Sequence, residues 1–175
     1  MNMEILDKKL TALIEGLADK KTTLATIEKI RDKGNVKILP YIFEVLFNNP
    51  SEDVYKAIKN MLFDIKDIKA VPYIFDAISN EKYKNHQAFL VSMLWEAGLD
   101  CKDKTEELIN LSINSDPLTI IEILTVIENF EITIPKKEAS KYKAIITKTI
   151  KVSADLSKNK LLESLLSVID LVAEK

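Results

Sequence analysis

The stretch LPYIFEVLFNNPSEDVYKAIKNMLF, residues 39–63, decides the fold, because much of its pattern returns 32 positions later. Residues 39–44 read LPYIFE, and residues 71–76 read VPYIFD. At the same offset, residues 61–64 (MLFD) align with residues 93–96 (MLWE). A self-similar unit of about 32 residues that contains two matching segments predicts stacked helical hairpins.

Apolar residues inside this unit recur with the period of an α-helix. The second segment carries them at Val54, Ala57, Ile58, Met61, Leu62 and Ile65. This i, i+3, i+4, i+7 spacing places them on one stripe of a helix, whereas a strand would alternate apolar and polar residues. We therefore expect each repeat to hold two helices with one apolar face each.

Helix starts and bends are also predicted from particular residues. Asn49 before Pro50 is typical of a capped helix start, and Asp116 before Pro117 repeats this pattern. Pro40 and Pro72 occupy equivalent places in the first helix of two repeats. We expect both to lie inside that helix and to bend its axis.

Weaker copies extend the repeat to both ends of the chain. A third copy follows at an offset of 33 or 34, and residues 4–33 and 137–174 have the pattern of a leading and a trailing hairpin. The sequence thus predicts about five hairpins in a single domain, residues 1–175, which is long enough to bury a substantial core.

Composition supports an all-α class and limits the partners. Hydrophobic residues make up 47% and charged residues 30% of the chain, and the 3 glycines and 5 prolines are too few for a β architecture rich in turns. The formal charge of −2 supplies no general field for a polyanion, which argues against nucleic acid as the partner.

The single cysteine and the apolar segments indicate a compartment. Cys101 has no second cysteine with which to form an internal disulfide, and Glu4 and Asp7 stand where a signal peptide would be basic and then apolar. The most apolar run, residues 118–127, contains Glu122 and is too short to cross a membrane. We expect a cytoplasmic protein without a transmembrane helix.

Residues 36–100, and above all the proline of the first helix and the Asp53-Val54 pair that opens the second, resemble the HEAT-repeat family. The family usually places Arg after this pair, where Tyr55 and, in the next copy, Gln87 stand. The resemblance implies a right-handed α-α superhelix of helical hairpins. Its second helices would line a concave surface of the kind that commonly holds another protein.

Aromatic residues mark the candidate binding face. With 100° per residue, Phe63 falls opposite the apolar stripe of its helix, and Trp95 has the same register in the next repeat. We expect the two rings to stand side by side, about 10 Å apart, and to anchor a protein or peptide. The same arithmetic places Tyr55, Lys59, Val91, Gly98 and Glu128 near this face. Alternatively, a modest rotation of the helices would turn both rings into the core between repeats.

No catalytic, cofactor or metal site is predicted. His86 and Cys101 are the only histidine and cysteine, too few for a zinc site, and the glycines form no phosphate-binding loop. We therefore expect a non-catalytic scaffold. The alternative is a HEAT-like enzyme that acts on DNA or a small molecule, of the glycosylase or bilin-lyase type; against DNA stands the single arginine, Arg31.

Charges and leucines near the C-terminal end suggest further contacts. Residues 101–135 hold 7 acidic and 2 basic side chains, whereas residues 136–160 hold 8 lysines. Lys137, Lys141 and Lys148 share one helix face, which is either solvated or contacts phosphate, an acidic partner or the acidic segment of another copy. Eight apolar residues of the last helix exceed one buried stripe, so self-association through the C-terminal hairpin is a further alternative: Leu161, Leu162, Leu165, Leu166, Val168, Ile169, Leu171 and Val172.

Overall fold

The computed structural model describes residues 8–33, 35–130 and 132–174. Residues 4–7 of the expected leading hairpin and Gly34 lie outside the described residues. The chain forms two compact units, unit 1 (Met1–Lys84) and unit 2 (Asn85–Lys175). The single-domain organisation stays a prediction.

Ten α-helices account for most of the described chain, which confirms the all-α class. Unit 1 contains α1 (Lys8–Ala18), α2 (Thr23–Lys33), α3 (Leu39–Leu46), α4 (Glu52–Phe63) and α5 (Ala70–Ile78). Unit 2 contains α6 (Gln87–Glu96), α7 (Thr105–Asn114), α8 (Pro117–Asn129), α9 (Lys136–Val152) and α10 (Leu156–Val172). Short 3-10 helices precede α3 (Val36–Ile38), α6 (Glu81–His86) and α7 (Lys102–Lys104).

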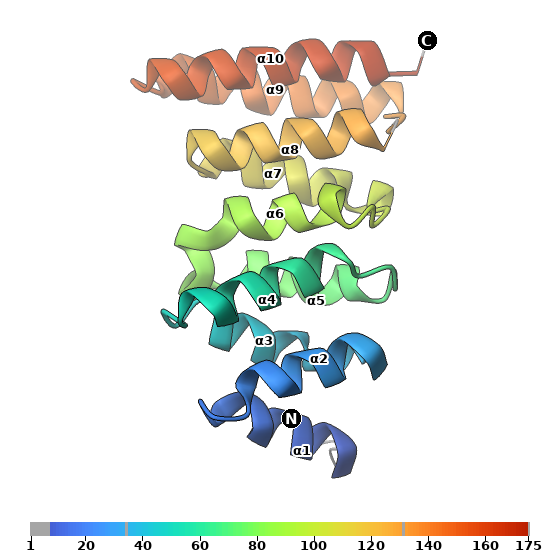
Figure 1. Ribbon diagram of the computed structural model, residues 1–175. Helices are drawn as coiled ribbons and strands as arrows, with labels where there is room; N and C mark the ends of the chain where they lie inside the picture. Colours follow the sequence, from blue (N-terminus) through green and yellow to red (C-terminus); the bar gives the residue numbers. More distant parts are fainter. Residues whose placement is uncertain (1–7, 34, 131, 175) are drawn as a thin grey trace. The chain divides into compact units, whose positions relative to one another are not determined.

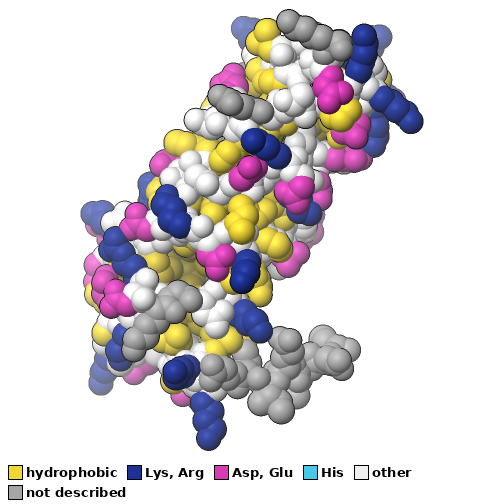
Figure 2. Space-filling model, turned by 90° about the vertical axis from the view of Figure 1, so that its right-hand side faces the viewer, with side chains coloured by type: hydrophobic (Ala, Val, Ile, Leu, Met, Phe, Trp, Pro, Cys, Tyr) yellow, Lys and Arg dark blue, Asp and Glu magenta, His cyan; other side chains and the backbone are white. Residues whose placement is uncertain are grey.

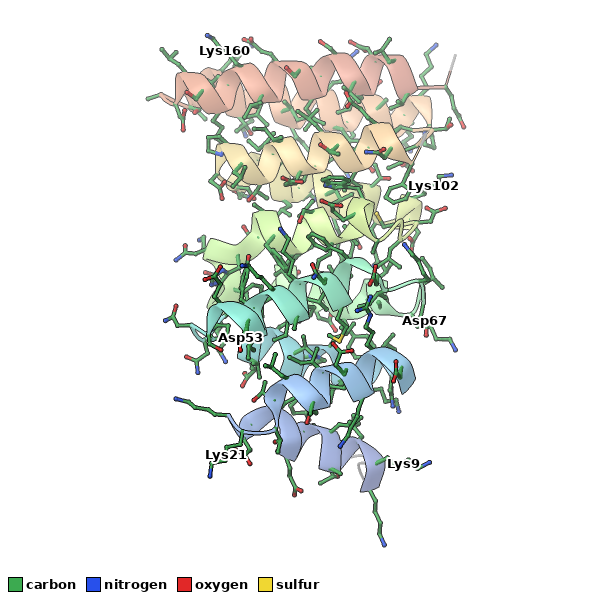
Figure 3. The ribbon with its side chains drawn as sticks, viewed as in Figure 1. Lys9, Lys21, Asp53, Asp67, Lys102 and Lys160 are labelled. Carbon is green, nitrogen blue, oxygen red and sulfur yellow. The ribbon has the colours of Figure 1, made fainter. Side chains whose placement is uncertain are left out.

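In unit 1, each helix from α3 onward packs side by side with the helix two places before it in the chain. The helix α3 contacts both α1 and α5, and α2 contacts α4, while α1 also packs against α2 and α3 against α4 (Figure 1). The turns alternate between the two ends of these helices: Lys21 and Asp53 lie at one end and Asp67 at the other (Figure 3). Unit 1 is therefore built of antiparallel helix pairs in two layers.

Unit 2 repeats this arrangement. The helix α8 lies between α6 and α10 in one layer, and α7 packs against α9 in the other (Figure 1). Hairpin contacts join α7 to α8 and α9 to α10. We call α2, α4, α6, α8 and α10 the second helices and α1, α3, α5, α7 and α9 the first helices.

The two copies of the pentapeptide have the same pattern of burial. Pro40 is exposed, Tyr41 is half-buried, and Ile42 and Phe43 are buried, and residues 72–75 repeat this order. The match extends to the second helices, where residues 61–64 and 93–96 share one burial pattern. In these two segments, equivalent positions of the 32-residue repeat therefore have the same burial, because the same stripe of each helix faces its neighbours.

An aspartate or asparagine turn marks the approach to successive first helices. The side-chain oxygens of Asn35, Asp67 and Asp100 each accept a hydrogen bond at 3.0 Å from the backbone N–H of the lysine two residues later. These residues recur at offsets of 32 and 33. Such turns occupy a backbone donor and favour a change of chain direction, so they extend the repeat into its loops.

The proline positions differ from the prediction. Pro40 lies in the first turn of α3 and Pro72 is the third residue of α5, so neither interrupts a helix interior. In the first turn the N–H that proline lacks has no intrahelical partner, and the fixed φ of proline suits a helix. The predicted bend of the first helices is therefore wrong.

One of the two predicted caps is present. The Asp116 carboxylate accepts a hydrogen bond at 3.0 Å from the Thr119 N–H and caps α8, with Pro117 as its first residue. Asn49 has a positive φ of 49° and lies two residues before the N-cap of α4, Ser51, so its predicted capping role is wrong. Asparagine tolerates this left-handed conformation better than most residues.

The end of unit 2 is closed by backbone hydrogen bonds. Ile134, in the loop before α9, donates its N–H to the Val172 carbonyl and accepts from the Glu174 N–H, each at 2.9 Å. Ile132 and Ile134 are both buried. The loop between α8 and α9 is thus held against the end of α10, which places three helices of the unit in fixed relation.

Candidate protein-binding surface

In unit 1, the face of α4 turned away from the core carries Tyr55, Lys59 and Phe63. The three residues are spaced four apart, so they lie along one stripe of the helix. Tyr55 is exposed, while Lys59 and Phe63 are half-buried. Lys59 Nζ lies 5.2 Å from the centroid of the Phe63 ring, within the range of a cation–π contact. Phe63 is thus partly covered by a lysine of its own helix.

The neighbouring second helix, α2, adds an apolar residue and an ion pair. Leu24 is exposed at 41%. At the other end of α2, Arg31 forms an ion pair of 2.5 Å with Asp64, the residue that follows α4. Both partners are about half exposed, so the pair orients the helix ends more than it stabilises the fold.

In unit 2, the Trp95 side chain is tied to the next second helix. Its indole Nε1–H donates a hydrogen bond of 2.7 Å to Oε2 of Glu122, which joins α6 to α8. Trp95 and Glu122 are both half-buried. The indole is therefore neither fully outward nor core: one edge is used inside unit 2, and part of the ring is accessible.

The end of α6 explains the position of the tryptophan. Gly98 has a φ of 68°, and the Leu99 N–H bonds the Leu94 carbonyl at 2.8 Å, which is a Schellman termination. The helix stops one residue beyond Trp95. The indole therefore lies in the last turn of α6.

The structure corrects the predicted position of Val91 on α6. Its side chain has no exposed surface, so its expected place on the outward face is wrong. The helix α6 buries Leu90, Val91, Met93 and Leu94, a much wider face than the corresponding part of α4. A helix that is apolar around most of its circumference is buried on several sides, and Val91 stands where the previous repeat has Lys59.

The helix α8 also carries exposed apolar side chains. Glu128 is exposed, as predicted from its register. Leu118 and Ile121 are exposed at 58% and 44%, and the sequence pattern had not singled them out. Their signal was present: the run from Leu118 to Ile127 holds more apolar residues than one buried stripe can use.

The only histidine lies at the start of a helix and the only cysteine lies in the interior. His86 is half-buried at the N-cap of α6. Cys101 is fully buried. Burial, followed by the negative charges of Asp100 and Asp103, raises the pKa of the Cys101 thiol to about 12. A thiol with this pKa is almost entirely protonated near neutral pH and is a poor nucleophile.

Two lysines of the lysine-rich segment pair with carboxylates of unit 2. Lys141 of α9 pairs with Glu106 of α7, and Lys143 pairs with Asp170 of α10, each at 2.5 Å. Tyr142, which stands between these two lysines in the sequence, is buried. Lysine and acidic side chains are intermixed over the face in Figure 2, with apolar patches between them. The surface shown carries no field of one sign.

The last helix uses most of its surplus apolar residues within unit 2. Leu162, Leu165 and Ile169 are buried, Leu161, Leu166, Val168 and Val172 are half-buried, and Leu171 is exposed at 84%. The helix α10 packs against both α8 and α9, so it needs two apolar faces. Self-association stays a prediction.

None of the described helices is long and apolar enough to cross a membrane. Within the same residues, no group of three or more His, Cys, Asp and Glu side chains is placed to hold a metal ion. Several carboxylates instead pair with a lysine or arginine of another element, as the ion pairs above illustrate.

Comparison of the chain with protein-family models, with curated proteins and with solved structures found no match.

Proposed function

We propose that this protein is a non-catalytic, HEAT-like helical scaffold that binds a protein or peptide on the exposed face of its second helices. The alternating packing within each unit, second helix on second helix and first helix on first helix, supports a repeat architecture. The proposal extends this packing to a right-handed superhelix of five hairpins.

One observation carries the proposed function: exposed large apolar side chains concentrate on the second helices. Among the described residues, six of the eight lie there, namely Leu24, Tyr55, Leu118, Ile121, Leu156 and Leu171. The other two are Ile68 in a loop and Val152 at the end of α9. Because large apolar side chains are exposed more often on the second helices than on the first, the second helices are the better candidates for an interaction surface.

The half-buried rings of Phe63 and Trp95 would serve as anchors. Trp95 is held by Glu122 and Phe63 is covered by Lys59, so both rings are already fixed in place. A fixed aromatic edge loses little entropy on binding. Tyr55, Leu118 and Ile121 would supply most of the new contact area. The buried, unpaired Cys101 fits a reducing compartment, and we place the protein in the cytoplasm.

The test compares surface variants for capture of a partner that copurifies with the 175-residue chain. We expect Tyr55→Ala and the double variant Leu118→Ser, Ile121→Ser to keep the melting temperature and to lose at least about tenfold in capture, the effect of one good anchor. Val152→Ser is the matched control, since Val152 is exposed at 80% on a first helix.

Two results would refute the proposal. One is full capture by both second-helix variants. The other is an equal loss in the Val152→Ser control, because binding would then follow general surface apolarity. A salt-sensitive gel shift with DNA, or turnover of a small molecule, would favour the enzymatic alternative instead.

A further inference from the structure

The first helices of unit 1 form a second, chemically different surface. Between α3 and α5 lies a hollow of about 410 Å³. Its lining is drawn from the repeated pentapeptide: Tyr41 and Tyr73 come from the second place of each copy, and Glu44 and Asp76 from the fifth. The two tyrosines are half-buried and the two acids are exposed. Because α3 and α5 pack side by side, each helix contributes one tyrosine and one carboxylate to the hollow.

A lysine of unit 1 already uses one carboxylate of this hollow. Lys82 Nζ donates a hydrogen bond of 2.5 Å to Oε1 of Glu44 and lies 5.5 Å from the centroid of the Tyr83 ring. Tyr83 also lines the hollow and packs against Phe47, with ring centroids 5.2 Å apart. An ammonium group held by a carboxylate and an aromatic ring gains both an ion pair and a cation–π contact.

The second half of the hollow offers the same groups without an internal cation. Asp76 forms no ion pair with a lysine or arginine of the described chain. It lines the hollow together with Tyr73, as Glu44 does with Tyr41. Carboxylate and tyrosine are the groups that recognise ammonium and guanidinium ions.

We propose that the hollow between α3 and α5 binds a lysine- or arginine-bearing segment of a partner protein, with Asp76 as the ion-pair acceptor and Tyr41 and Tyr73 as the aromatic wall. The Asp76 carboxylate, which has no lysine or arginine partner among the described residues, selects a cationic occupant. A single exposed ion pair is weak in water, so a free amine gains little. A peptide adds apolar and backbone contacts to the tyrosine rings, which favours a protein segment. This surface is separate from the second helices and does not depend on the proposed function.

The first experiment measures binding of an acetylated and amidated Gly-Lys-Gly-Lys peptide to the 175-residue chain by NMR titration. We expect backbone shifts confined to α3, α5 and the turn that contains Lys82. Asp76→Asn should weaken binding at least about threefold, the effect of one exposed charge pair. Asp32→Asn, which removes the same charge from an exposed site on α2, should change the dissociation constant by less than about 1.5-fold.

The second experiment removes the internal competitor. Lys82→Ala frees the Glu44 carboxylate and should tighten binding at least about threefold. Lys56→Ala is the matched control, because Lys56 pairs with Glu52 on α4, outside the hollow. It should leave the affinity unchanged, and circular dichroism should give unaltered melting curves for all four variants.

Three results would overturn the proposal. Equal weakening by Asp76→Asn and Asp32→Asn would indicate nonspecific attraction to a negative surface. Unchanged or weaker binding by Lys82→Ala would show that Glu44 is not part of the site. Cadaverine, a free diamine, binding as tightly as the peptide would identify a small amine as the occupant.

Discussion

The Trp95 indole nitrogen lies 2.7 Å from Oε2 of Glu122, so a donor in the last turn of α6 is satisfied by a carboxylate of α8. The two residues are 27 positions apart and half-buried. A hydrogen bond to an ionised acceptor is about twice as strong as a neutral one. This contact fixes one edge of the indole of the only tryptophan in the chain.

We predict that Glu122→Ala lowers the free energy of unfolding by about 1–2 kcal/mol, because it leaves the indole N–H without its acceptor in a half-buried site. Glu122→Gln keeps an acceptor oxygen and should cost less. Urea unfolding followed by tryptophan fluorescence measures both effects. Glu128→Ala, on an exposed position of the same helix, is the control and should change stability by less than about 0.5 kcal/mol. A Glu122→Ala protein as stable as this control would contradict the structural role of the contact.

The Cys101 thiol should be unreactive toward a thiol-specific reagent in the native protein at pH 8 and fully reactive in guanidinium chloride. Its burial raises the pKa to about 12 from the ordinary 9.0, so almost no thiolate is present in the folded state. Rapid labelling without denaturant would show that the residue is accessible.

The same shift predicts a pH dependence of stability. The pKa of the Cys101 thiol is raised in the folded protein, so its contribution to stability is complete below about pH 9 and is lost as pH rises toward about 12. Between these two values the thiol is ionised in the unfolded chain and still protonated in the native one. The slope approaches about 1.4 kcal/mol per pH unit for one group. Urea unfolding at pH 7, 9 and 10.5 measures it. Cys101→Val removes this thiol's contribution, so its slope should be shallower; parallel slopes would contradict the prediction.

The turn at Asp67 should tolerate asparagine and not alanine. Asp67→Ala removes the side-chain acceptor for the Lys69 N–H and should cost about 0.5–1.5 kcal/mol, the value of one hydrogen bond. Asp67→Asn keeps an oxygen at this position, as Asn35 does in the preceding repeat. Thermal unfolding distinguishes the two variants. Equal losses would show that the charge, and not the turn, is what the position requires.

Gly16 should resist a side chain because of Thr26. A Cβ added at Gly16 would lie 2.4 Å from Thr26 Oγ1, so α1 and α2 approach closely at this point. We expect Gly16→Ala to destabilise the native chain by about 1–3 kcal/mol, the usual cost of overpacking.

In a Thr26→Ala background the obstructing atoms are absent, and Gly16→Ala should be neutral or stabilising, because alanine is the better helix former. A double-mutant cycle from urea unfolding tests this coupling. Additive effects of the two substitutions would mean that the helices do not meet at these residues.

Much of the fold could be predicted from the sequence, since the predicted features are local. The stripe of Val54, Ile58 and Met61 identifies the buried face of α4 from spacing alone, and all three residues are buried. Asp116 before Pro117 identifies the start of α8 for the same reason. The turns at Asn35, Asp67 and Asp100 carried an equally clear signal, because they recur with the repeat.

The candidate site was less predictable, because exposure depends on how many neighbours a helix has. Val91 was assigned to the outward face from the register of α4, but α6 is apolar on more sides and buries it. The helix register placed Phe63 opposite the core, but the register does not reveal that Lys59 covers its ring. The run that contains Leu118 and Ile121 has more apolar residues than one buried stripe can use, but the sequence does not reveal which of them are exposed.

By itself, the sequence determined that this chain is helical and that its central segments are copies of one unit, because helical period and repeat spacing are properties of residues close together along the chain. Tertiary structure alone decided that Trp95 hydrogen-bonds to Glu122, that Lys82 forms an ion pair with Glu44, and that Arg31 forms one with Asp64. These pairs join residues 27 to 38 positions apart. Their side chains meet only after the helices have packed, and packing is set by the combined apolar faces of several helices rather than by any one segment.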